Sequence, residues 1–316
     1  MARRLRLESE DGCYHVINRG NYRAHIFREA KTKVAFLKCL GETCERTGWR
    51  VHAWCLMSNH YHLAITTPRA NLVEGMGWFQ GTFATRFNRW RSEHGHLYQG
   101  RYKSIVLDPM ESLGPACHYI HLNPVRAHLC DVPALRSYAW TSVAWILEPS
   151  LRATWFDPES CLRDAGHLPD TLEGREKYLQ YLRWLAEDEP AQKRLRFEQM
   201  SREWIVGGAE FTKAIVKEQR ELVGQGPQIA HEIRAARAAV WAEALDRLLA
   251  AAGRSRADVA DSSKSVPWKL AIASRLKAET TVTNRWLGQN LFMGNLHEVS
   301  RKVAAWDRRQ PDNGPR

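Results

Sequence analysis

The sequence predicts an α+β fold: a ferredoxin-like antiparallel sheet with helices on one face, followed by an all-α domain of the helix-turn-helix kind. Two observations predict it. Between about residues 14 and 108, the apolar spacing alternates in the order strand, helix, strand, strand, helix, strand, which is the ferredoxin-like order. Beyond a glycine-rich break near residue 225, only helical spacing remains.

The first elements follow from short-range periodicity. Residues 14–20 are typical of a strand, and residues 31–47 have helical spacing that Gly48 ends. Two apolar runs, 49–57 and 61–67, are separated only by Ser58-Asn59-His60, which predicts a β-hairpin.

The remaining elements of the sheet domain are less regular. Residues 71–94 predict a second amphipathic helix with arginines near its end. Residues 99–108 predict a further strand or hairpin, and residues 109–129 a helix that Pro124 interrupts, because proline lacks the backbone donor a helix needs.

Composition shifts divide the chain into a sheet domain over 1–148, a mostly helical connecting region over 149–222 and a helical domain over 223–316. Gly224-Gln225-Gly226-Pro227 is the best linker candidate. Short helices joined by tight turns, one at Gly294, predict a helix-turn-helix DNA-binding module. The helices expected in this last domain are 229–251, 268–277, 283–291 and 296–306.

The charge balance indicates an acidic partner. The 316 residues include 46 Lys and Arg against 35 Asp and Glu, a formal net charge of +11, which most simply favours nucleic acid. No run approaches the ~18 apolar residues of a membrane span, and the basic N-terminus lacks the apolar run of a secretory signal. Seven scattered cysteines without a Cys-x-x-Cys pair predict reduced thiols in a cytoplasmic compartment. For a protein that binds nucleic acid, we expect a cytoplasmic, nucleoid-associated location.

Two histidines in the predicted hairpin are candidate metal ligands. His60 and His62 lie two apart on a strand, so they face one side while Tyr61 faces the other. Neutral imidazoles are common metal ligands, although two histidines at this spacing also occur by chance.

A second element carries a phenol and an amide. On a helix, Tyr119 and Asn123 lie at i and i+4 and point the same way, toward the histidines in the predicted fold. Asn123 is then a candidate third metal ligand. The alternatives are that Asn123 caps a helix beginning at Pro124 and that Tyr119 is a core aromatic.

Four sequence blocks together resemble a known family. They are 14–21, 56–63, 98–104 and 119–127. Their content and order resemble the signature blocks of Y1 transposases of the HUH superfamily, and more closely the REP-associated tyrosine transposases, which are bacterial relatives of the IS200/IS605 enzymes.

The resemblance implies DNA transposition and recombination by a single-strand DNA endonuclease with the HUH Y1 fold. By this resemblance, His60 and His62 match the metal ligands and Tyr119 the nucleophile, which forms a 5′-phosphotyrosine. Asn123 falls where relatives use Gln as third ligand. We expect Mg²⁺ or Mn²⁺ as cofactor, while zinc stays open on ligand chemistry alone.

The resemblance also implies a DNA substrate and residues that contact it. The expected substrate is a single-stranded DNA hairpin of a REP-like palindrome, bound by a monomer or homodimer without a membrane. We expect phosphate or base contacts from residues near the site, although arginines on a helix can also form a solvated face. These residues are Asn18, Arg19, Asn21, Arg86, Arg101 and Lys103.

The helical domain resembles the DnaA-like C-terminal domains attached to some of these transposases. Its candidate DNA contacts are basic residues of the predicted helix-turn-helix, and its alternative role is stabilisation or oligomerisation. These candidates are Lys269, Arg275, Lys277 and Arg285. For the whole chain, the alternative to a nickase is a sequence-specific DNA-binding or regulatory protein that keeps the fold without cutting. A hydrolase of small phosphoesters is disfavoured by the charge and by the lack of a carboxylate-rich site.

Overall fold

The computed structural model describes residues 7–224 and 226–309, with the backbone alone for residues 218–237. The chain forms two compact units, Met1–Glu221 and Leu222–Arg316. The break falls one residue from the predicted start of the helical domain, while the predicted linker residue Gln225 lies outside the described residues.

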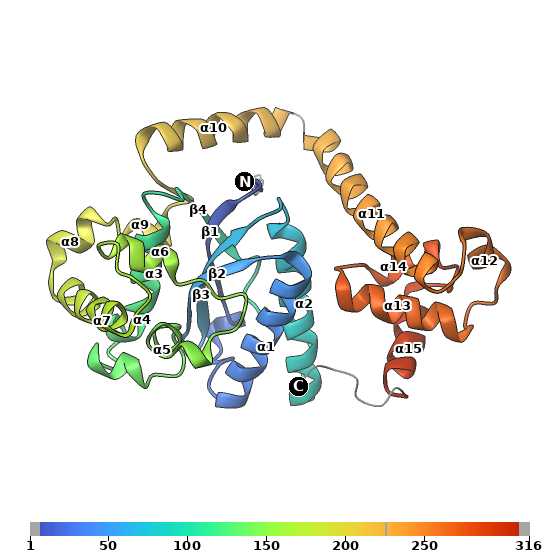
Figure 1. Cartoon of the computed structure of the whole chain (residues 1–316), viewed down its shortest axis with the longest axis horizontal. Coiled ribbons are helices and arrows are strands. Elements are labelled where there is room, and N and C mark those ends of the chain that lie inside the picture. The colour runs from blue at the N-terminus through green and yellow to red at the C-terminus, as the bar shows by residue number, and fades with distance from the viewer. Residues whose placement is uncertain (1–6, 225, 310–316) are drawn as a thin grey trace. The chain divides into compact units, whose positions relative to one another are not determined.

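The first unit contains the sheet and the helices around it (Figure 1). In chain order, its strands and α-helices are β1 (Gly12–Arg19), α1 (Ala30–Thr47), β2 (Arg50–Leu56), β3 (His60–Thr67), α2 (Leu72–Arg91), β4 (Lys103–Leu107), α3 (Leu113–His121), α4 (Asn123–Arg126), α5 (Val143–Leu147), α6 (Glu159–Asp164), α7 (Leu172–Glu187), α8 (Glu189–Arg194), α9 (Gln199–Arg202) and β5 (Ile205–Val206). Helix α10 (Ala209–Gly224) follows, and the short 3₁₀ turns are η1 (Asn21–Arg23), η2 (Pro133–Arg136) and η3 (Pro149–Leu151).

The sheet has the order β2-β3-β1-β4-β5, and its first four strands pair antiparallel. The element order β1-α1-β2-β3-α2-β4 confirms the ferredoxin-like prediction. The expected all-antiparallel sheet needs one correction, because β5 comes from the connecting region and pairs parallel with β4. The predicted end of the sheet domain at residue 148 therefore does not separate compact units.

Helices α1 and α2 lie side by side on one face of the sheet (Figure 1). Side chains that alternate along β3 reach them, so Tyr61 packs against Phe36 of α1 and Phe79 of α2, with ring centroids 4.8 and 6.3 Å away. This aromatic layer anchors the strand whose opposite face carries the two histidines.

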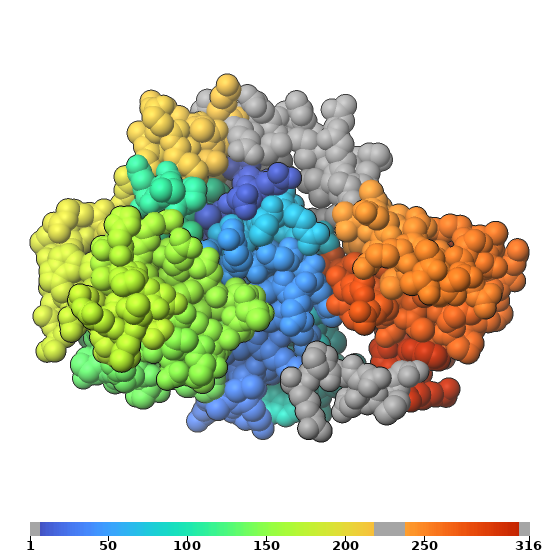
Figure 2. Space-filling model, viewed as in Figure 1, coloured from blue at the N-terminus to red at the C-terminus, as the bar shows by residue number. Residues whose placement is uncertain are grey.

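Helix α3 packs on the opposite face of the sheet, against β1, β2 and β3. The helix predicted over 109–129 is divided into α3 and α4 at Leu122, two residues before the expected point, because Pro124 occupies the first turn of α4 and cannot donate to the preceding turn. Leu122 itself keeps right-handed helical angles, so the direction of the chain does not change sharply there. Helices α6 and α7 then cover α3, and Figure 2 shows these green and yellow segments as one continuous surface.

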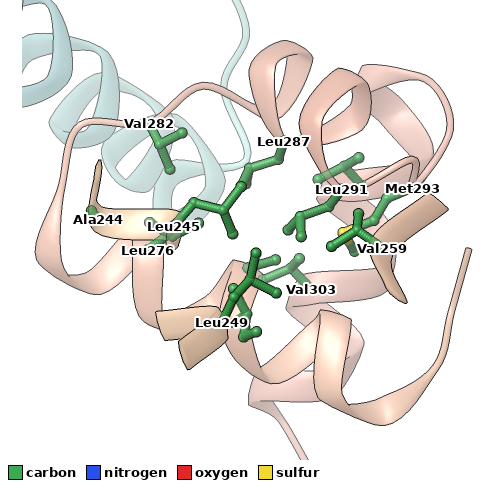
Figure 3. Packing of buried hydrophobic residues seen from close by; sticks show 13 residues of the cluster. Ala244, Leu245, Leu249, Val259, Leu276, Val282, Leu287, Leu291, Met293 and Val303 are labelled. Atoms are coloured by element: carbon green, nitrogen blue, oxygen red, sulfur yellow. The ribbon is translucent and has the colours of Figure 1, made fainter. Parts of the chain in front are cut away.

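The second unit is all helical. Its helices are α11 (Gly226–Ala251), α12 (Arg256–Asp261), α13 (Pro267–Glu279), α14 (Asn284–Asn290) and α15 (Leu296–Asp307). Leu245, Leu287 and Val303 meet in one buried cluster (Figure 3). Burial of such apolar side chains gives this unit a hydrophobic core of its own.

The turn between α14 and α15 needs two glycines. Gly294 has a φ of +96°, in the region that favours glycine, and a Cβ on Gly288 would lie 2.3 Å from the Gly294 carbonyl oxygen. Asn295 and Glu298 then form a capping box that begins α15. Among the described residues, no helix is long and apolar enough to cross a membrane.

Candidate active site

Strand β3 presents His60 and His62 on the face opposite Tyr61, as the spacing predicts. Their ring centroids lie 5.0 Å apart. The Tyr61 hydroxyl, on the other face, accepts a hydrogen bond from Gln80 Nε2 at 2.6 Å. The two imidazoles are therefore neighbours on a strand that is firmly packed from behind.

The hydrogen bonds of His60 leave one nitrogen free. Its Nδ1 lies 2.7 Å from Asn59 Oδ1, an atom that can only accept, so Nδ1 carries the proton and Nε2 keeps its lone pair. Burial lowers the pKa of His60 to about 4, with a further contribution from Arg19. The ring is neutral near pH 7, as a metal ligand must be.

His62 is oriented by a histidine that sequence reasoning missed. His62 Nδ1 lies 2.9 Å from Nε2 of His15 on β1, and both rings are buried. Burial lowers the pKa of His62 well below its usual value and that of His15 to about 3. His15 stands in the first of the four sequence blocks, but its role becomes clear only once β1 is known to pair with β3.

Tyr119 lies on α3 with its ring against both of these histidines. The ring centroids are 6.0 Å from His62 and 5.8 Å from His15. The side chain is 5 % exposed, so the phenol sits at the edge of the buried layer. The structure therefore brings together the tyrosine and the histidine pair from elements 57 residues apart in the chain.

A buried polar network fixes α3 on both sides of Tyr119. The Tyr178 hydroxyl of α7 lies 2.9 Å from His118 Nδ1 and 2.7 Å from His121 Nδ1. The outer nitrogens reach Asp164 and Ser142, at 2.9 and 2.8 Å. Because every one of these imidazole nitrogens has a partner, the network holds the helix in one position.

Asn123 does not cap a helix, so the capping interpretation is wrong. Leu122 is the N-cap of α4 and no side chain caps it. Instead, Asn123 Nδ2 donates to the Tyr119 carbonyl oxygen at 3.2 Å. Because the amide nitrogen is used in this way, the side-chain oxygen is the atom left for a metal.

The donor set fits a divalent cation. Two neutral imidazoles with Nδ1 hydrogen-bonded and an amide oxygen are suitable ligands for a metal with open positions. Within the described residues, no group of three His, Cys, Asp or Glu side chains is placed to hold an ion.

The DNA contacts expected in the first unit divide into engaged and exposed side chains. Asn18 is buried and donates to the Gly100 carbonyl oxygen at 3.2 Å. Arg86 makes a bidentate pair with Glu42 at 2.9 and 2.8 Å. Lys103 Nζ donates to two backbone carbonyl oxygens, of Ser201 and Arg202. These three side chains are committed within the fold.

The side chains of Arg19, Asn21 and Arg101 are the three candidates that remain accessible to DNA. Arg101 is exposed beside β4, and Arg19 and Asn21 are half-buried at the end of β1, where the Asn21 side-chain oxygen accepts from the Tyr22 backbone. Gly20 pairs with Tyr98 in an isolated bridge, which joins this loop to the segment before Arg101.

The four candidates in the second unit also differ. Lys269 is fully buried and its Nζ donates to the carbonyl oxygens of Val259 and Ser262, so it is not available as a DNA contact. Arg275 forms an ion pair with Glu279, and Lys277 is half-buried. Arg285 is exposed on α14.

Two further side chains surround Tyr119. The Arg126 guanidinium lies 4.7 Å from the centre of the phenol ring, and Phe197 packs edge-on against it at 5.5 Å. Arg126 stands in one of the four sequence blocks, but its spacing alone does not set it apart from other arginines. Phe197 has no sequence signal, because it reaches the site through the packing of the connecting region.

Comparison with known proteins gives one family and one solved structure. Residues 9–123 match the family model described as Transposase IS200 like, which confirms the resemblance for that segment. No curated protein matches the chain. A solved structure described as a REP-associated tyrosine transposase bound to a REP hairpin is similar, with 12% sequence identity and a TM-score of 0.40 over 50% of this chain and 92% of that chain.

Proposed function

We propose that this chain, whose residues 9–123 belong to the IS200-like transposase family, cuts and rejoins single-stranded DNA with Tyr119 as nucleophile. The observation that carries the proposal is the placement of the Tyr119 ring 6.0 Å from the His62 ring, on the sheet face that also holds His60. A tyrosine beside paired neutral imidazoles is suited to attack a phosphodiester.

The reaction is a balanced exchange of ester bonds. Tyr119 Oη attacks phosphorus, the bond from phosphorus to the 3′ oxygen breaks, and the phenolic proton passes to water. The departing 3′ oxygen takes a proton from water, which leaves a 3′-OH and a 5′-phosphotyrosine. A second 3′-OH reverses the step and returns the proton to Tyr119, so no nucleotide triphosphate is consumed.

His60, His62 and Asn123 are the residues that would hold the metal, for which we propose Mg²⁺ or Mn²⁺. Bound there, a divalent ion neutralises charge on the phosphate and polarises phosphorus. The imidazole hydrogen bonds described above keep the two rings oriented for this role.

The substrate that we propose is a hairpin of a REP-like palindrome, in line with the sequence blocks. Arg19, Asn21 and Arg101 are the described side chains best placed to bind its unpaired segment, because they lie exposed or half-buried on joined segments near the end of β1.

For the second unit we propose contact with the duplex stem through α15 as well as α14. In a helix-turn-helix the second helix enters the major groove. Val299 and Val303 face the core of this unit, Ser300 and Arg301 are exposed on other sides of the helix, and Arg308, also exposed, is its C-cap.

The test is covalent capture. The full chain is incubated with a labelled hairpin oligonucleotide and Mg²⁺ or Mn²⁺, and an SDS-resistant adduct is measured on a gel. We expect an adduct with the wild-type chain and none with Tyr119→Phe. Tyr22→Phe, which changes a 93 % exposed tyrosine, serves as the matched control. Binding of hairpins without any adduct under all metal conditions would favour the non-cleaving DNA-binding alternative.

A further inference from the structure

The Arg126 side chain lies over the proposed nucleophile. Its guanidinium carbon is 4.7 Å from the centre of the Tyr119 ring and 6.0 Å from that of Phe197. Phe197 in turn meets Tyr119 edge-on, with an interplanar angle of 90°. The phenol is thus held between a cation and an aromatic wall supplied by the connecting region.

The backbone explains why Arg126 reaches this place. Tyr119 and Arg126 are seven residues apart, which is about two helical turns, so they share a face wherever the helical path continues. The path does continue through the junction of α3 and α4, because Leu122 keeps right-handed helical angles and the Arg126 N–H donates to the Leu122 carbonyl oxygen at 2.9 Å.

The charge of Arg126 has no carboxylate partner in the described part of the chain. Some other arginines of this unit do have such a partner, as in the pairs of Arg136 with Glu176 and of Arg86 with Glu42. The Arg126 side chain is exposed, so an anion can reach it from solvent. A cation without a carboxylate partner, lying over the ring of the proposed nucleophile, is placed to bind an anion.

We propose that Arg126 is a further catalytic residue that binds the non-bridging oxygens of the scissile phosphate. The guanidinium is planar, so it can stack on the Tyr119 ring and still offer N–H donors at its edge. Two parallel N–H donors of the guanidinium match the spacing of two phosphate oxygens. Its positive charge stabilises the negative charge that develops on these oxygens as the phenol oxygen attacks.

This inference rests on the proposed function, since it assigns a role within the same reaction. Phe197 is a positioning residue in it: buried to 3 % exposure, it fixes the face of the ring that Arg126 covers. The family match ends at residue 123, so both side chains lie outside the matched segment.

The test measures the single-turnover rate of adduct formation for the full-length chain, with saturating hairpin oligonucleotide and Mn²⁺. We expect Arg126→Ala to lower this rate about 10²- to 10³-fold, the loss found when one preorganised donor to a developing charge is removed. Arg126→Lys keeps the positive charge but lacks the paired N–H donors of a guanidinium, so its rate should lie between those of the wild type and Arg126→Ala. Arg183→Ala, which removes an exposed arginine of α7, should leave the rate unchanged.

Two readouts separate this role from a structural one. Mn²⁺ affinity measured by calorimetry should change less than threefold in Arg126→Ala, and added guanidinium ion should restore part of the rate. If Arg126→Ala has a lower melting temperature than the wild type, the rate is measured in Arg126→Gln instead, because glutamine keeps a planar group over the Tyr119 ring. A rate within twofold of wild type in Arg126→Gln, or a loss that guanidinium does not relieve, overturns the inference. A wild-type chain that forms no adduct instead overturns the proposed function.

Discussion

The two imidazoles that we propose as metal ligands, His60 and His62, are oriented by different partners. His60 uses Asn59, its neighbour in sequence, while His62 uses His15 on an adjacent strand. For His62 to bind a metal through Nε2, its Nδ1 must carry the proton and His15 Nε2 must accept it. In the proposed metal site, His15 is therefore a residue that orients the ligand His62 through the contact at 2.9 Å and is not itself a ligand.

Replacing His15 by Phe tests this at the scale of one residue. The variant keeps a ring in the buried space but removes the acceptor, so we expect Mn²⁺ affinity, measured by calorimetry without DNA, to weaken about 10- to 100-fold. His25→Phe, at an exposed position, should bind Mn²⁺ like the wild type. Equal affinities of the two variants would mean that His62 needs no orienting partner.

The site residues that the sequence predicted are set by local spacing, whereas those that it did not predict depend on contacts between residues far apart in the chain. His60, His62 and Tyr119 lie within strongly periodic segments, so their shared faces follow from local spacing. His15, Phe197 and Tyr178 act through strand pairing or through the packing of α7 and the segment after it, which local patterns do not encode. The prediction that Lys269 contacts DNA is wrong for the same reason. A lysine is expected at the surface from its charge, but two backbone carbonyl groups accept hydrogen bonds from its ammonium group in the interior.

At the scale of elements, the position of α3 depends on the Tyr178 hydroxyl. Tyr178→Phe leaves two buried imidazole nitrogens without their partner, and a buried unsatisfied group costs about 1–3 kcal/mol. We expect a lower melting temperature and slower adduct formation, because α3 carries the proposed nucleophile. Tyr181→Phe changes a half-buried ring beside His118 and should have little effect on either. Equal melting of the two variants would show that the network does not hold the helix.

Helix α15 allows a second test at this scale. Arg301→Ala should weaken binding of the full chain to the duplex stem and reduce the slope of log Kd against log salt by about 1, as expected for one lost phosphate contact. Arg247→Ala removes an exposed arginine that pairs with Glu279 on another part of the same unit, and should leave the slope unchanged. If only Arg247→Ala reduced the slope, the DNA would bind near Arg247 and not along α15.

The order of elements in the sheet was predictable, because each strand and helix has its own periodicity. The partner of β4 was not: β5 is a two-residue strand nearly 100 residues further on, too short for any alternating pattern. The helices of the connecting region were expected, but their contact with α3 rests on buried polar pairs such as Asp164 with His118.

At the scale of the whole molecule, the two units should respond differently to acid. His15, His52 and His121 of the first unit are buried, and burial lowers the pKa of each below its usual value. In the unfolded chain, histidine titrates near about 6.5. The unfolded state therefore binds more protons below that pH, so the stability of the first unit falls as the pH drops from about 6.5 toward the folded-state values.

Calorimetry of the metal-free chain at pH 7 and pH 5 checks this expectation. The melting transition of the first unit should move down more than that of the second, where the only described histidine side chain, His297, is exposed. Equal shifts of the two transitions, or a larger shift of the second, would contradict the assignment of neutral buried histidines to the sheet unit.

In the proposed reaction, Tyr119 becomes covalently joined to DNA. Mass spectrometry of the wild-type adduct, after digestion of protein and DNA, identifies the modified residue itself. We expect a phosphate-linked nucleotide on the peptide that contains Tyr119. A nucleotide on any other residue would show that Tyr119 is not the nucleophile.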